Sequence, residues 1–209
     1  MERLKSLQEI MAPDSRTGAF VKFDEKTNEI LPIQLEDYHR RLSDIALREQ
    51  VPEDIRSYFE TVKNICLYGW FVYSFFTVSA FLSYIAIEMS LRRRFQNDDP
   101  DRKWPFKRLL QEARDRCLIS ERGFLSIQAE REYHAKLAAE LGSLFEQSVA
   151  DYCSVLVDCL PQLRNSFAHP SSNTILTPGD ALSSLTVAAE FINQLFHDPA
   201  ASTGGIPET

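Results

Sequence analysis

The sequence predicts an all-α protein whose main part is an up-and-down helical bundle. Apolar residues recur at steps of three or four along most of the chain between residues 35 and 196, which is the period of an α-helix. Two of these segments begin with a proline closely followed by acidic residues, which is a helix-start signal. The apolar content of 44% and the charged content of 25% are those of a globular protein with a full core.

Composition divides the chain into three expected regions. The helical domain covers about residues 51–197, and residues 1–50 form a small N-terminal extension. Residues 198–209 are rich in Pro, Ser, Gly and Thr and are expected to form a disordered tail. The first residues lack an apolar core, so we expect no signal peptide and a cytoplasmic location.

The N-terminal extension contains the one pattern that is typical of β-structure. Residues 18–23 and 29–33 flank a polar turn and predict a small β-hairpin, in which Pro32 confines the second strand to an edge. Residues 35–45 carry apolar residues at helical spacing and predict a short helix. We expect this extension to pack on the helical domain or to contact a partner.

The first long helical segment of the main domain begins at Pro52 and continues into the most apolar part of the chain. No charged residue lies between Ile65 and Ile87. One continuous helix over residues 52–95 would be about 66 Å long. Since that is long for a domain of this size, we expect a break near Gly69.

The uncharged stretch also admits a second interpretation, because 18 or more apolar residues can form a membrane span. Its aromatic residues are scattered along the stretch rather than gathered at two interfaces, and several serines interrupt it. The amphipathic helices elsewhere need a buried partner, which this segment provides. We therefore prefer a soluble central helix and no membrane contact, with a single-span membrane anchor as the third interpretation of the chain.

Four further helices are predicted after the central one, including a helix that ends near His169. Residues 106–117 have an apolar face and follow Pro105, and residues 126–140 form a charged helix. Thr177 and Asp180 flank Pro178 in a variant of the capping box, so the last helix starts there.

The helix before it carries the residues on which a functional interpretation depends. Its predicted apolar face consists of Phe145, Val149, Tyr152, Leu156, Cys159, Leu163 and Phe167. Arg164 falls at the edge of this face, and Asn165 points to the other side. Since Pro170 disfavours the α conformation at His169, the helix is expected to stop there, with the imidazole on a terminal turn. Arginine binds phosphate through a fork of N–H donors, and histidine moves protons near neutral pH.

This Arg-Asn-x-x-x-His arrangement at a helix end, with another helix close behind, resembles the motif of the HEPN superfamily of small all-α domains. The resemblance matches Arg164, Asn165 and His169 position by position and does not cover the N-terminal extension. It implies a homodimer that sets two motifs face to face and, in active members, metal-independent endoribonuclease chemistry without a cofactor. Some members are toxins or antiviral defence effectors, which implies a neutralising antitoxin or regulatory partner.

Two alternatives remain open for this motif. The chain could be a non-catalytic module of the same fold that binds RNA, a nucleotide or a protein. Structurally, Arg164 could cap helix carbonyls while His169 is an ordinary residue of the C-terminal turn.

Other charged residues are weaker candidates for the same site. Arg92, Arg93 and Arg94 either form a solvated helix end or line the mouth of an RNA cleft and contact phosphates. Glu88 either pairs with Arg164 or is the polar end of its helix. The net charge of −7 and a pI near 5.2 argue against a general nucleic-acid coat protein but leave room for a local basic cleft.

The cysteines and histidines do not predict a metal site. Cys66, Cys117, Cys153 and Cys159 have no Cys-x-x-Cys pairing and each lies in an apolar or helical stretch, so we expect reduced thiols in the core. No His, Cys or carboxylate pair has metal-ligand spacing.

Overall fold

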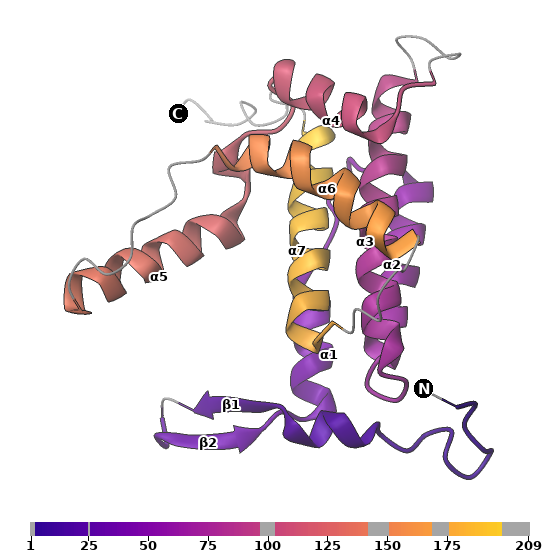
Figure 1. Cartoon of the computed structure of the whole chain (residues 1–209), viewed down its shortest axis with the longest axis vertical. Helices are drawn as coiled ribbons and strands as arrows, with labels where there is room; N and C mark the ends of the chain where they lie inside the picture. The colour runs from indigo at the N-terminus through magenta and orange to yellow at the C-terminus, as the bar shows by residue number, and fades with distance from the viewer. Residues whose placement is uncertain (1–2, 25, 97–102, 142–150, 169–175, 198–209) are drawn as a thin grey trace, which may run out of the picture.

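The computed structural model describes residues 3–24, 26–96, 103–141, 151–168 and 176–197. Within these ranges the chain forms seven α-helices, two short 3-10 helices and one two-stranded sheet, which confirms the predicted predominance of α-helix (Figure 1). The α-helices are α1 (Leu35–Asp44), α2 (Glu53–Tyr68), α3 (Ser74–Phe95), α4 (Phe106–Asp115), α5 (Leu125–Leu141), α6 (Tyr152–Ala168) and α7 (Pro178–Leu195).

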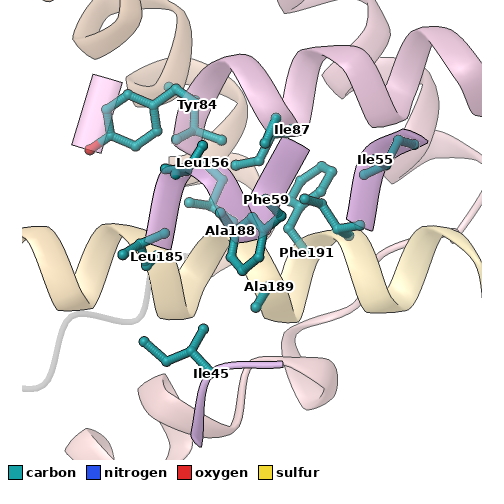
Figure 2. Close-up of a cluster of buried hydrophobic side chains, with 14 of the residues drawn as sticks. Ile45, Ile55, Phe59, Tyr84, Ile87, Leu156, Leu185, Ala188, Ala189 and Phe191 are labelled. Carbon is teal, nitrogen blue, oxygen red and sulfur yellow. The ribbon is translucent and has the colours of Figure 1, made fainter. Parts of the chain in front are cut away.

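Helix α3 is the centre of the fold. It packs along α2 and α7, while α6 crosses it obliquely and α4 covers its C-terminal end (Figure 1). Figure 2 shows the side chains that meet between these helices, among them Phe59 of α2, Ile87 of α3 and Phe191 of α7, all fully buried. Burying one such side chain contributes about 1.5–3 kcal/mol, so this layer contributes substantially to stability.

A short break at Gly69 separates α2 from α3, as the sequence predicts. Helix α2 ends at Tyr68, and the chain makes a tight turn before α3 begins at Ser74. A Cβ atom at Gly69 would lie 2.5 Å from Cδ1 of Phe76 and 2.8 Å from the carbonyl oxygen of Cys66. Because real Cβ atoms do not approach so closely, only glycine lets the two helices meet at this angle.

Helix α3 is the one helix in the described part of the chain that is long and apolar enough to cross a membrane. In the most apolar 18-residue part of this helix, 56% of the residues are buried inside the protein. The buried hydroxyl groups of Ser79, Ser83 and Ser90 donate hydrogen bonds of 2.7–2.9 Å to carbonyls of the same helix. These serines therefore fit a packed interior without needing partners from another element.

The predicted β-hairpin is present, formed by β1 (Val21–Asp24) and β2 (Glu29–Pro32) in antiparallel register. The extension also packs on the helices. The hydroxyl group of Tyr38 on α1 lies 3.0 Å from Sγ of Cys66 in α2. Asn193 of α7 accepts a hydrogen bond from the backbone N–H of Arg48 and donates one to the carbonyl of Ala46. The extension thus shares the core, although the boundary near residue 50 stays a prediction.

The helix starts agree closely with the sequence signals. Thr177 caps α7, and its side chain accepts from the backbone N–H of Asp180 while Asp180 accepts from the backbone N–H of Thr177. Pro52 is the N-cap residue of α2, so α2 begins one position later than predicted, whereas α4 begins at Phe106, directly after its N-cap Pro105. The predicted tail, residues 198–209, lies outside the described residues.

The prediction of core thiols is correct for Cys66 and Cys153 and wrong for Cys117 and Cys159, whose side chains are exposed. Cys117 follows α4 with a φ of 56°, and Cys159 lies on the outer side of α6. All four thiols are free. Burial raises the pKa of Cys66 and raises that of Cys153 to about 11, so both stay protonated at neutral pH.

The Gly69 break provides a test of the fold. Replacing Gly69 by alanine forces the Phe76 ring or the helix end to move, which should destabilise the protein by about 1–3 kcal/mol. Gly18→Ala is the matched control, because a Cβ atom there meets nothing within 4 Å. Urea unfolding measures both. An unchanged midpoint for Gly69→Ala would contradict the packing described here.

Candidate functional site

The candidate site is organised by the face that α6 turns toward α3 and α4. The buried residues of α6 are Cys153, Leu156, Val157 and Leu160. Cys159 and Leu163, which the sequence placed on the buried face, are exposed, so that part of the predicted face is wrong. Apolar residues line both sides of this helix, and only its contacts with α3 and α4 decide which side is buried. Phe145 and Val149 lie outside the described residues.

Because the buried face of α6 differs from the predicted one, Arg164 also lies elsewhere relative to that face. Arg164 lies one turn after Leu160, so it continues the buried face instead of standing at its edge. Its side chain is 34% exposed, and its Nε atom is buried without an acceptor among the described residues. The ring of Phe167 stacks on that of Tyr84 in α3, with centroids 6.1 Å apart. The end of α6 is therefore held against α3 by both an apolar and a charged contact.

The charged contact is a carboxylate shared by two arginines. Glu88 of α3 is only 8% exposed. Its Oε2 accepts a hydrogen bond from Nη2 of Arg164 at 3.0 Å. Its Oε1 accepts from Nη2 of Arg92 at 2.6 Å and from Nε at 3.2 Å. The pairing of Glu88 with Arg164 that the sequence suggested is thus present.

The second arginine of this cluster was readable in the sequence, since Glu88 and Arg92 are four residues apart on one helix, the spacing of a stabilising ion pair. Arg92 also donates from Nη1 to the carbonyl of Trp104 at 3.3 Å. We call Glu88, Arg92 and Arg164 the Glu88 cluster. Its two guanidinium groups outnumber its one carboxylate, so the cluster has a net charge of +1. This remaining positive charge can attract an anion.

Asn165 is placed to orient Arg164. Its Oδ1 accepts a hydrogen bond from Nη1 of Arg164 at 3.0 Å, while its own side chain is exposed. With Glu88 on one Nη atom and Asn165 on the other, the plane of the guanidinium group is defined. Pre-organisation of this kind lowers the entropy that a bound phosphate would otherwise cost.

The other predicted arginines have separate partners. Arg93 donates to Oε1 of Gln96 at 3.1 Å, and Arg94 donates from Nε to the carbonyl of Leu195 at 3.0 Å. The second contact satisfies a carbonyl at the C-terminal end of α7, which is a structural role. Of the three arginines proposed as RNA contacts, the structure therefore brings only Arg92 into the Glu88 cluster.

His169 lies outside the described residues, which reach Ala168 at the end of α6. The position of its imidazole relative to Arg164 stays a prediction. Helix α6 also makes an exposed contact with α4, where Nζ of Lys107 donates to Oδ1 of Asp158 at 2.9 Å. This hydrogen bond lowers the pKa of Asp158.

Among the described residues, no group of three or more His, Cys, Asp or Glu side chains is placed to hold a metal ion. Comparison with family models, with curated proteins and with solved structures gives no match for this chain. The described residues of the site are the Glu88 cluster and Asn165.

The Glu88 cluster should contribute to stability as well as to chemistry. Arg164→Ala leaves a nearly buried carboxylate with one partner, so we expect a loss of about 1–3 kcal/mol, reduced from the fully buried case because Arg164 is partly exposed. Lys107→Ala is the control, since it breaks an exposed pair whose removal should cost under about 1 kcal/mol.

A double-mutant cycle isolates the pair itself. Glu88→Gln combined with Arg164→Gln should lose less than the sum of the two single variants, with a coupling energy of about 1 kcal/mol or more. Urea unfolding gives all four values. Strict additivity would show that Glu88 and Arg164 do not interact.

Proposed function

We propose that this chain is a metal-independent endoribonuclease of HEPN type, built on an up-and-down bundle of that fold. The observation that carries the proposal is the guanidinium group of Arg164, held by Glu88 and Asn165 at the end of α6. It lies five residues before His169 in the sequence. The Glu88 cluster keeps a net positive charge where a scissile phosphate would bind.

The proposed reaction uses the substrate's own nucleophile. His169 takes the proton from the ribose 2′-OH as the 2′-oxygen attacks the phosphorus, and the bond to the 5′-oxygen breaks. A protonated imidazole, either the same one or that of a second copy, then gives a proton to the leaving 5′-oxygen. The products are a 2′,3′-cyclic phosphate and a 5′-OH end. Arg164 stabilises the charge that develops on the non-bridging oxygens, and Asn165 keeps the guanidinium group oriented.

In this proposal the protein acts in the cytoplasm as a toxin or an antiviral defence effector, and its substrate is RNA. A homodimer would supply two Glu88 clusters and two His169 side chains across a two-fold axis. Such an activity needs control, so a neutralising antitoxin or regulatory protein is the proposed partner.

A second candidate function is a binding module of the same fold that holds RNA, a nucleotide or a protein without cleaving it. One observation favours it. Both Nη atoms of Arg164 already have protein partners, so the guanidinium group has a structural role that does not depend on catalysis. The experiments below separate the two candidates.

Cleavage tests the enzyme directly. We expect the purified protein to cut single-stranded RNA in EDTA, to leave 2′,3′-cyclic phosphate ends and to spare DNA, which lacks the 2′-OH. His169→Ala should lower the rate by about 100-fold or more, the usual contribution of a positioned acid or base. His39→Ala, at an exposed histidine of α1, is the control.

Arg164 variants complete this test at a temperature where they remain folded. Arg164→Ala should be as slow as His169→Ala, and Arg164→Lys should restore little, because a point charge cannot reproduce the fork. If the wild-type protein leaves RNA intact but binds it, the binding module replaces the enzyme.

Assembly is a separate prediction of the proposal. Leu163, 40% exposed beside the motif, offers an apolar contact for a second copy. We expect a dimer by light scattering in the micromolar range, and Leu163→Glu should shift it to monomer. Ile30→Glu, at a 70% exposed apolar position on the hairpin, should leave the dimer intact. A wild-type monomer at high micromolar concentration would contradict the dimeric site.

A further inference from the structure

The charge of this protein is distributed very unevenly along the chain. Residues 92–116 contain nine of its 23 Lys and Arg residues and five of its 30 Asp and Glu residues, a net charge of +4. The rest of the chain therefore carries a net charge of −11. A basic segment of this size in an acidic protein indicates a local surface for an anionic partner.

The fold gathers the described parts of this segment, residues 92–96 and 103–116, at one end of the molecule (Figure 1). The C-terminal end of α3 and the whole of α4 lie together there (Figure 1). Helix α4 turns all of its apolar side chains inward: Phe106, Leu109, Leu110 and Ala113 are buried. Its basic side chains therefore face solvent, and half of the Lys107 side chain is exposed.

Three arginines of this segment surround a pair of aromatic rings. The rings of Phe95 and Trp104 are 6.4 Å apart. The guanidinium group of Arg108 lies 5.1 Å from the centre of the Trp104 ring, and that of Arg116 lies 5.2 Å from the centre of the Phe95 ring. Arg92 donates to the backbone carbonyl of Trp104. We call Arg92, Arg108 and Arg116 the arginine surface.

The carboxylates of Glu88 and Glu112, in the part of the chain that the structure describes, neutralise part of its charge. Glu112 accepts from Nε of Arg116 at 2.7 Å and from Nη2 of Arg108 at 3.4 Å. Arg92 shares Glu88 with Arg164. The four arginines and two glutamates together carry a net charge of +2. The side chains of Arg92, Arg108 and Arg116 remain about half exposed, so they can reach an anion in solvent.

We infer that the arginine surface binds the phosphate backbone of single-stranded RNA and leads the strand to the Glu88 cluster. This inference rests on the proposed function, because it says by which path the RNA substrate reaches the proposed active site. Arg92 belongs to both groups, so the arginine surface is continuous with the Glu88 cluster and a strand bound along it can reach Arg164. Arginines stacked on aromatic rings are suited to phosphates that repeat along a strand.

An anionic membrane is the competing ligand, and the structure disfavours it. A helix that binds a membrane surface combines basic residues with exposed apolar side chains that enter the lipid. On α4 the apolar residues are buried in the core instead. The surface therefore offers charge and hydrogen-bond donors without an apolar anchor.

The test measures binding rather than cleavage. The probe is a fluorescent 20-nucleotide 2′-O-methyl RNA, which cannot supply the 2′-OH nucleophile, and its affinity is measured by anisotropy at several salt concentrations. Arg108→Gln with Arg116→Gln should weaken binding about tenfold near 150 mM salt and reduce the slope of log K against log salt by about 1.4, the value for two lost phosphate contacts. Arg108→Lys with Arg116→Lys should keep most of the slope.

The control is Lys26→Gln with Arg40→Gln, which removes the same charge from the exposed hairpin turn and α1. The unfolding temperature of every variant must match that of the wild type within a few degrees. If the double variant is less stable than this, Arg108→Gln alone takes its place in the binding measurement. Equal RNA affinity for the surface variant and the control would overturn the inference. Binding to phosphatidylserine vesicles in place of RNA would also overturn it.

These outcomes are independent of catalysis. If the protein binds the probe through the arginine surface but cleaves no RNA, the inference stands and the proposed enzyme fails. If it cleaves RNA while the surface variant binds as well as the wild type, the inference fails and the enzyme stands.

Discussion

One carboxylate sets the arrangement of the candidate site. Glu88 lies on the central helix, almost fully buried, and an unpaired charge there would cost several kcal/mol. Arg92 from the same helix and Arg164 from α6 both bind it. The pairing adds a charged contact where the end of α6 meets α3, and it gathers two guanidinium groups at one point. The contacts that stabilise the fold are thus the contacts that orient the proposed phosphate-binding arginine.

The composition of α3 explains why this happens at its C-terminal end. From Ser74 to Ile87 the helix has no charged residue, and its buried hydroxyl groups bond within the helix. The ion pairs of α3 therefore begin at Glu88, whereas Thr77 and Tyr84 in the uncharged part make neutral hydrogen bonds to Leu176 and Ser184. Beyond it, Arg94 satisfies a carbonyl at the end of α7, and Arg92 reaches the chain before α4. The central helix is apolar where it supports the core and basic where it meets the proposed substrate path.

Local sequence signals were sufficient for most of the fold. The hairpin, the break at Gly69 and the capping box of α7 depend on nearby residues, so they could be predicted. The buried face of α6 could not, because apolar residues line both of its sides and contacts with α3 and α4 decide between them. Exposure of Cys159 and burial of the Arg164 Nε follow from that same choice.

The candidate site was predictable to a similar degree. The possible partnership of Glu88 and Arg164 could be proposed from residue types, yet the two residues are 76 positions apart and only the packing of α6 on α3 brings them together. The role of Arg94 at the end of α7 has no local signal, since its acceptor belongs to a distant helix. The motif therefore indicated which residues to consider, and the tertiary structure decided which of them meet.

The central claim is that Glu88 and Asn165 hold Arg164 ready for a phosphate beside His169. A crystal structure of the protein bound to a short 2′-O-methyl RNA tests it most directly. We expect a phosphate oxygen within about 3 Å of the Arg164 guanidinium group, the distance of a charge-assisted hydrogen bond, with the His169 imidazole on the side of the 2′-oxygen. Glu88 should still bind Arg164 in that complex. An RNA bound away from Arg164, or a His169 turned away from the strand, would contradict the account.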